Sequence, residues 1–134
     1  MAIEEVRIEN VLLAKLITSD DWKEGLCFFS NESDFIQVGT WHYSKGKELL
    51  AHIHNKVDRM VSRTQEVIFV KNGSIKAMIY DFEGNHVKDL IAKKEDTLIL
   101  LNGGHGYIIL ENDTQVLEIK NGPYLGAEID RRRI

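Results

Sequence analysis

Two apolar runs joined by an Asn-Gly turn stand near the middle of the chain. Residues 66–82 read EVIFVKNGSIKAMIYDF, in which β-branched and aromatic residues stand on both sides of Asn72 and Gly73. Such residues fit the pleated surface of a strand, and Asn-Gly is strongly preferred in tight turns between antiparallel strands. The segment therefore predicts a β-hairpin with strands over residues 66–70 and 75–82.

Short alternating runs separated by turn residues continue on both sides of this hairpin. The chain has one proline and little apolar spacing of the helical kind. About eight or nine strands without helical crossovers favour an all-β fold, and a jelly-roll barrel fits best. We expect residues 1–134 to form one domain that ends in an extended arm after Pro123. The other expected strands cover residues 6–17, 35–43, 48–54, 87–92, 97–101, 107–110 and 115–119.

Charge and composition limit the classes of function. The net charge of −4 argues against a nucleic-acid binder, which needs a basic face to neutralise phosphates. No apolar run approaches the ~20 residues that span a bilayer, and the acidic start Met1–Glu5 differs from a secretory signal. We therefore expect a cytoplasmic protein without a membrane partner. The single Cys27 is expected in the core, and Arg131–Arg133 are expected to form a solvated tail.

Three histidines and one glutamate are the candidate metal ligands. His52 and His54 are two residues apart in an expected strand, so their imidazoles should point to the same side. Glu66 and His105 stand at the starts of other expected strands and could complete the site inside a barrel. Imidazole and carboxylate together suit a divalent transition metal, namely iron, manganese, nickel, copper or zinc.

These residues also resemble the conserved motifs of the cupin superfamily. His52-Ile53-His54, Glu66 and Gly73 follow the order of the first cupin motif, and Leu101–His105 resembles the second, weaker motif. The resemblance covers roughly residues 39–110 and implies a double-stranded β-helix, or jelly-roll barrel. It also implies that His52, His54, Glu66 and His105 are the metal ligands.

The sequence departs from the cupin motifs at the segment between His54 and Glu66. Eleven residues stand there, residues 55–65, and this interval is longer than the family has. The insert could overhang the barrel mouth, where Arg59 or Arg63 would bind an anionic substrate, or it could be a solvated loop. His42 and Tyr107 are further candidates for orienting a substrate.

Two classes of function stay open. One is a metal-dependent enzyme, such as a dioxygenase, isomerase or lyase, that acts on a small oxygenated or anionic metabolite at a site of three histidines and one glutamate. The other is metal-free: a protein like the sugar-nucleotide epimerases and isomerases, in which a histidine acts as base, or a non-catalytic module that binds a small carbohydrate ligand. A homodimer through exchange of the N-terminal strand and the C-terminal arm is a further hypothesis.

Overall fold

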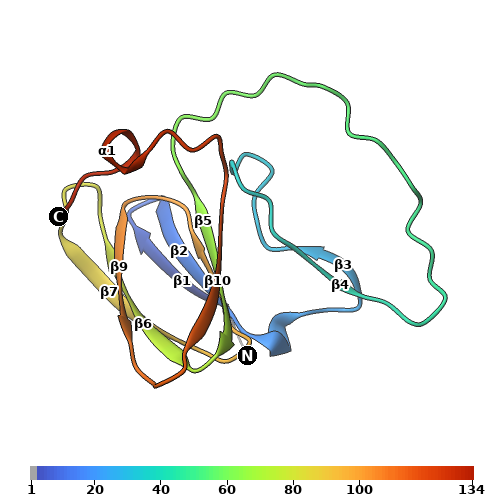
Figure 1. The fold of residues 1–134 in the computed structure, drawn as a ribbon, viewed down its shortest axis with the longest axis horizontal. Helices are drawn as coiled ribbons and strands as arrows, with labels where there is room; N and C mark the ends of the chain where they lie inside the picture. Colours follow the sequence, from blue (N-terminus) through green and yellow to red (C-terminus); the bar gives the residue numbers. More distant parts are fainter. Residues whose placement is uncertain (1–2) are drawn as a thin grey trace.

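The computed structural model describes residues 3–134, and almost all of its regular structure is β-strand. Figure 1 shows the strands along the chain, with the helix α1 near the C-terminus. The elements are β1 (Glu4–Ile8), β2 (Val11–Ile17), η1 (Ser19–Asp21), β3 (Gly25–Phe28), β4 (Gly39–His42), β5 (Glu66–Asn72), β6 (Ser74–Tyr80), β7 (His86–Lys93), β8 (Thr97–Leu100), β9 (Gly104–Ile109), β10 (Gln115–Lys120) and α1 (Ala127–Asp130).

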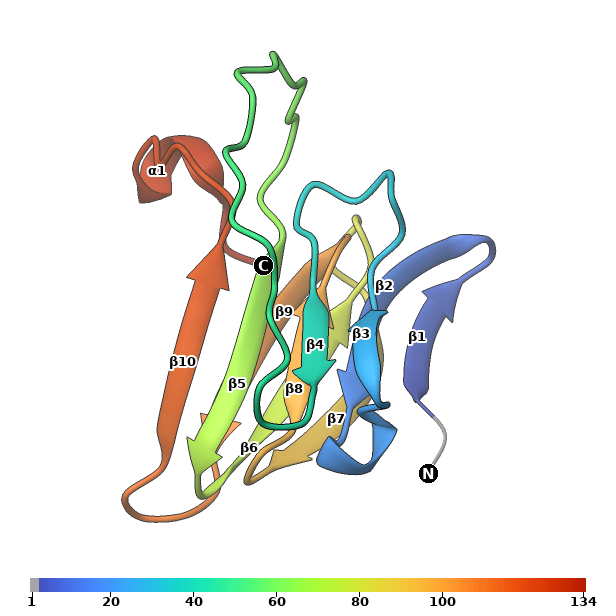
Figure 2. The same cartoon turned by 90° about the vertical axis from the view of Figure 1, so that its right-hand side faces the viewer.

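The strands form three antiparallel sheets. A five-stranded sheet has the order β1-β2-β8-β5-β10, a three-stranded sheet has the order β7-β6-β9, and β3 pairs with β4. Figure 2, turned by 90° from the first view, shows the five-stranded sheet with β10 and β1 at its two edges. The prediction of an all-β fold is therefore confirmed. The N-terminal strand β1 pairs with its own neighbour β2.

The Asn72-Gly73 turn is present, but the predicted hairpin is wrong. β5 pairs with β8 and β10, whereas β6 pairs with β7 and β9, so the turn carries the chain from one sheet to the other. Gly73 has a φ of +81°, and a Cβ on it would lie 2.2 Å from Oγ1 of Thr114. Only glycine fits at this turn. Any other residue would be strained by the positive φ, and its Cβ would clash with Thr114.

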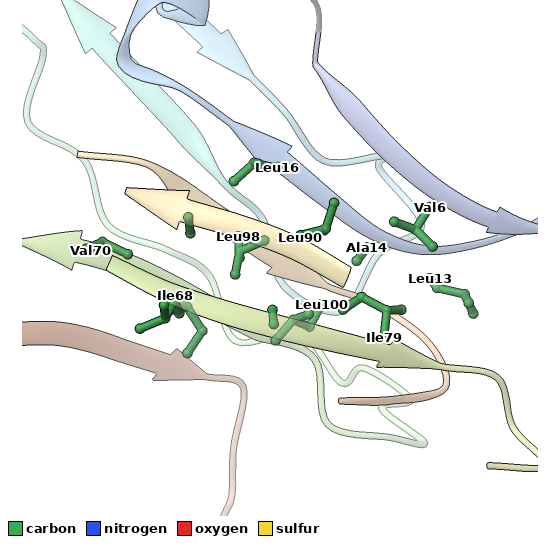
Figure 3. Packing of buried hydrophobic residues seen from close by; sticks show 13 residues of the cluster. Val6, Leu13, Ala14, Leu16, Ile68, Val70, Ile79, Leu90, Leu98 and Leu100 are labelled. Carbon is green, nitrogen blue, oxygen red and sulfur yellow. The ribbon is translucent and has the colours of Figure 1, made fainter. Parts of the chain in front are cut away.

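The main hydrophobic core lies between the two larger sheets. Figure 3 shows aliphatic side chains from both sheets meeting in this layer. Alternate residues of β8, Leu98 and Leu100, point into it, and β6 contributes Ile75, Ala77 and Ile79. Such face-to-face packing of two antiparallel sheets is a β-sandwich, since each sheet buries one apolar face against the other.

A second, smaller cluster covers the outer face of the five-stranded sheet. Ile99 and Leu101 point to this side and pack with Phe29, which directly follows β3. Lys15 Nζ donates a hydrogen bond to the carbonyl of Phe29 at 2.8 Å. Cys27, which was expected in the core, is only partly buried and packs against the edge of the same cluster. These contacts fix the β3–β4 hairpin on the outside of the sandwich.

Residues 43–65 contain no strand, so the expected strand over residues 48–54 is wrong. Every residue from 41 to 63 is exposed, and Figure 1 shows a long loop in this part of the chain that projects from the sandwich. Within residues 3–134, β9 pairs only with β6 and β10 only with β5, so the sandwich is open and the expected closed barrel is not formed. An alternating pattern produces a strand only where a neighbouring edge supplies hydrogen bonds.

Candidate binding cavity around Glu66 and His105

A cavity of about 1330 Å³ opens at the end of the sandwich where β5 begins and β10 ends. Its walls include β9 and β10, and segments 59–64 and 121–134 form its rim. Figures 1 and 2 show the C-terminal segment with α1 at this end of the molecule. The expected C-terminal arm therefore lies against its own chain, where Arg132 donates a hydrogen bond to the carbonyl of Phe82 at 3.0 Å.

Glu66 and His105 meet in the wall of this cavity. Glu66 is the first residue of β5, and its side chain shares a face with the core residue Ile68. His105 stands opposite Ile79 of β6 in the other sheet. Oε2 of Glu66 lies 2.5 Å from Nε2 of His105, so the contact bridges the two sheets at the end of the core.

A lysine completes the environment of the Glu66 carboxylate. Lys120 stands beside Glu66 in the β5–β10 ladder, and its Nζ lies 3.2 Å from Oε1 of Glu66 and 3.4 Å from Oε1 of Glu118. Burial of Glu66 raises its pKa, but His105, Glu118 and Lys120 together outweigh this effect and lower the pKa to about 2. Glu66 is therefore ionised at neutral pH although only 5% of its surface is exposed.

The contact with Glu66 determines what the other ring nitrogen of His105 can do. An ionised carboxylate only accepts hydrogen bonds, so Nε2 of His105 must carry the hydrogen that it shares with Glu66. In a neutral imidazole, Nδ1 is then the nitrogen that can accept a proton. Such a carboxylate–histidine contact fixes the orientation of the ring and its tautomer, as a general base requires.

Tyr107 places a phenol beside this pair. Its ring centroid lies 5.3 Å from that of His105, and its hydroxyl is buried without a hydrogen-bond partner among the described residues. Burial and the charges of Glu66 and Glu118 raise the pKa of Tyr107, so the hydroxyl keeps its proton. A buried hydroxyl without a partner is uncommon in folded proteins and can bond to a bound molecule.

Basic side chains gather on the rim of the cavity. The lining includes the insert residues Arg59 and Arg63 and the C-terminal residues Arg131–Arg133. Arg63 donates a hydrogen bond to Oδ1 of Asn102, and its guanidinium lies 5.1 Å from the ring centre of Phe82. The C-terminal arginines, expected to form a solvated tail, are exposed but border the cavity.

The other histidine candidates lie elsewhere. His52 and His54 stand in the exposed segment, with ring centroids 4.9 Å apart, and Nδ1 of His52 is 3.0 Å from the carbonyl oxygen of Leu50. His42 ends β4 and is exposed. None of these three histidines lines the cavity. Within residues 3–134, no group of three or more histidine, cysteine or acidic side chains is arranged to hold a metal ion.

The expected four-ligand metal site is therefore not assembled in one chain. Only Glu66 and His105 of the four residues come together, because the segment that carries His52 and His54 is not part of the sandwich. Two donors do not fit the four-coordinate sites that are usual for zinc or the open sites of other transition metals.

Glu118 and Lys120 line the cavity and were not among the expected site residues, although the sequence carries a signal for them. Val116 and Glu118 alternate along the expected strand 115–119, and Lys120 directly follows it, so continued alternation predicts that the three share one face. Two charges on one face of a strand in a β-sandwich indicate either a solvated face or a polar site. Because Lys120 pairs with the buried Glu66, this face of β10 is part of a polar site.

Comparison with known proteins gives no relative from which a function could be transferred. No protein-family model, no curated protein and no solved structure matches the chain. Within residues 3–134, no helix has the length and apolarity needed to cross a membrane.

Proposed function

We propose that the cavity binds a small oxygenated anion and that His105, held by Glu66, serves there as a general base. The observation that carries this proposal is the contact of 2.5 Å between Glu66 and His105 in a cavity with arginines on its rim. Nδ1 of His105 would take a proton from the ligand and return it, as an isomerase or epimerase requires. The hydroxyl of Tyr107 would donate a hydrogen bond to a ligand oxygen.

The basic rim supports a phosphorylated ligand. Guanidinium groups bind phosphate through paired hydrogen bonds, and Arg131–Arg133 with Arg63 bring several of them to one entrance. A cavity of about 1330 Å³ has room for a ligand larger than a simple sugar. A diphosphate at the rim with a sugar beside His105 matches this distribution, so a sugar-nucleotide is the ligand class that we propose.

We also propose that the fold is a cupin-like jelly roll. Successive strands from β5 to β10 alternate in part between the two sheets, with β5, β8 and β10 in one and β6, β7 and β9 in the other. Such crossing connections between two antiparallel sheets are typical of jelly rolls. The candidate motif residues Glu66, Gly73 and His105 all stand at strand ends or at the turn between the sheets.

A transition-metal site is the second candidate function. It is supported by the pairing of Glu66 with His105, which supplies one carboxylate and one imidazole, and by the exposure of His52 and His54. For this site to form, the exposed segment would have to bring His52 and His54 to Glu66 and His105. When bound, a metal would polarise a ligand oxygen.

Thermal unfolding with candidate ligands tests the main proposal. UDP-glucose, inorganic pyrophosphate and glucose would each be added to the protein, and the melting temperature measured. A ligand present at 100 times its Kd stabilises the fold by about 2.7 kcal/mol, so the melting temperature should rise with UDP-glucose and less with pyrophosphate. The double variant Arg131→Ala/Arg133→Ala should lose most of this rise.

Arg7→Ala is the matched control, because Arg7 is exposed on β1 and does not line the cavity. It should respond to UDP-glucose as the wild type does. An unchanged melting temperature with all three compounds, or the same rise in the double variant as in the wild type, would contradict the proposal.

A further inference from the structure

The segment from residue 43 to residue 63, here called the arm and distinct from the C-terminal arm, exposes an unusual amount of apolar surface. Ile53 is 91% exposed and Met60 is 89% exposed, and Leu50 and Val57 are also on the surface. Neither strand pairing nor burial of any residue is present along the arm. Several large apolar side chains exposed along one segment indicate a place where another molecule binds.

Both ends of the arm are fixed to the body of the protein. At its start, β4 pairs with β3, and the loop after β3 is anchored by Phe29 on the outer face of the five-stranded sheet. After its end, Gln65 accepts hydrogen bonds from the backbone of Phe35 and Ile36, and its own backbone donates to Asn121. The arm is therefore a long projecting loop with defined roots.

The sandwich offers free strand edges beside the cavity. β9 and β10 each pair on one side only, so each leaves a row of backbone donors and acceptors without a strand partner in the described chain. Ile108 and Leu117 on these strands are about half exposed. Free and apolar strand edges readily accept a further strand.

The two surfaces have matching patterns. If residues 48–54 are extended, Leu50, His52 and His54 share one face, and Leu49, Ala51 and Ile53 share the other. On β9, His105 and Tyr107 face the cavity, and Ile108 faces outward. An added strand would therefore place its histidines beside His105 and its apolar face beside Ile108.

We propose that the arm adds as a strand to the free edge of β9 in a second copy of this chain, and that the exchange is reciprocal. Its own β9 is the less suitable partner, because the β3–β4 hairpin fixes the start of the arm on the outer face of the other sheet. A stable interface uses roughly 20–30 residues a side, and the arm alone supplies most of that number. Each cavity is then bordered by His52 and His54 of the partner copy.

This inference deepens the proposed function, since it rests on that function for the role of the cavity, but the exchange itself can be tested without any ligand. Light scattering of the full chain should give the mass of two chains. Ile53→Asp should shift the mass to one chain at the same concentration, because it puts a charge into the proposed strand pair. Ile91→Asp, on the far strand β7 of the three-stranded sheet, is the matched control and should stay dimeric.

Cross-linking identifies the paired strands. In a Cys27→Ser background, Ile53→Cys and Ile108→Cys would be combined and treated with a short bismaleimide. We expect a covalent dimer whose peptide masses join residue 53 of one chain to residue 108 of the other. A wild-type mass of one chain, a bridge between the two positions within one chain, or a dimer without this bridge would each overturn the inference.

The outcomes separate the inference from the proposed function. A cross-linked dimer that shows no change in melting temperature with UDP-glucose or pyrophosphate would leave the exchange standing and contradict the proposed ligand. A monomer that is stabilised by UDP-glucose would contradict the exchange and support the proposed ligand.

Discussion

Oε2 of Glu66 lies 2.5 Å from Nε2 of His105, and this contact joins the two sheets at the point where the apolar core ends. Glu66 is nearly as buried as the core residues beside it, yet it is ionised. An ion in such a place must be paired, because desolvation without a partner is costly. The pair is therefore both a structural link and the chemical centre of the proposed site.

Replacing Glu66 by glutamine should destabilise the protein. Glu66→Gln removes the negative charge and leaves His105 and Lys120 without their partner, so the free energy of unfolding should fall by about 1–3 kcal/mol. Urea unfolding measures this change. Glu118→Gln is the control, because Glu118 is half exposed and its contact with Lys120 should contribute less than about 1 kcal/mol. Equal losses in the two variants would argue against a special role for the buried pair.

The same carboxylate should make stability depend on acid pH. The pKa of Glu66 is about 2 in the folded chain against an ordinary value of 4.5, so the folded state favours the ionised form. The resulting stabilisation is complete above the unfolded-state pKa and is lost as the pH falls from about 4.5 toward 2. Urea unfolding of the wild type and Glu66→Gln across this window should show a steeper loss for the wild type. Parallel curves would contradict the prediction.

Tyr107→Phe should separate binding from stability. The hydroxyl has no partner in the described chain, so its removal should leave the free energy of unfolding unchanged or raise it slightly. If the hydroxyl donates to the ligand, affinity for UDP-glucose should fall by about two- to tenfold, which is the worth of one hydrogen bond. Calorimetric titration measures the affinity. A stable variant with unchanged affinity would exclude the hydroxyl from the site.

Two glycines with the same φ should respond differently to alanine. Gly73 and Gly25 both have a φ of +81°, but a Cβ on Gly73 would meet Thr114, whereas a Cβ on Gly25 would have no atom within 4 Å. Gly25→Ala should therefore lose about 1 kcal/mol through backbone strain alone. Gly73→Ala should lose clearly more, since it adds a clash at the turn between the sheets. Thermal unfolding compares them, and equal losses would show that Thr114 moves aside.

Elemental analysis tests the second candidate function. After loosely bound ions are removed, that function predicts about one transition metal per chain in the wild type and little in His105→Ala or in His52→Ala/His54→Ala. His86→Ala is the control, because His86 pairs with Asp89 on the surface of β7. If the arms are exchanged, co-expression of the two defective variants should restore metal to about half of the sites in the mixed dimer. A wild type without metal after loading would rule this candidate out.

Local sequence patterns predicted most of the strands but not all of their partners. The alternation in residues 66–70 and 75–82 gave the strands β5 and β6 correctly, because β-branched side chains favour extended backbone wherever they are placed. Asn72-Gly73 predicted a turn equally well. Whether the chain pairs with itself after such a turn or crosses to another sheet depends on strands far along the chain, here β8 and β10 for β5 and β7 and β9 for β6.

For the candidate site, too, the sequence predicted some residues correctly and misplaced others. Glu66, His105 and Tyr107 were identified from their residue types and strand positions, and the structure places all three at the cavity. His52 and His54 were expected there because their spacing fits a strand. The spacing of two histidines shows only that they would share a face of a strand. It does not show which sheet edge that strand would pair with, and within the described chain residues 48–54 pair with no edge.

The burial of β8 on both faces has a consequence for the order in which the protein opens. All four of its residues are buried, between the main core on one side and the Phe29 cluster on the other, and both its edges are paired. Its amide hydrogens should be the last to exchange with deuterated solvent, only when the whole chain unfolds. Amides of the arm in an isolated chain should exchange at once, and their protection would be the earliest sign that a second molecule had arrived.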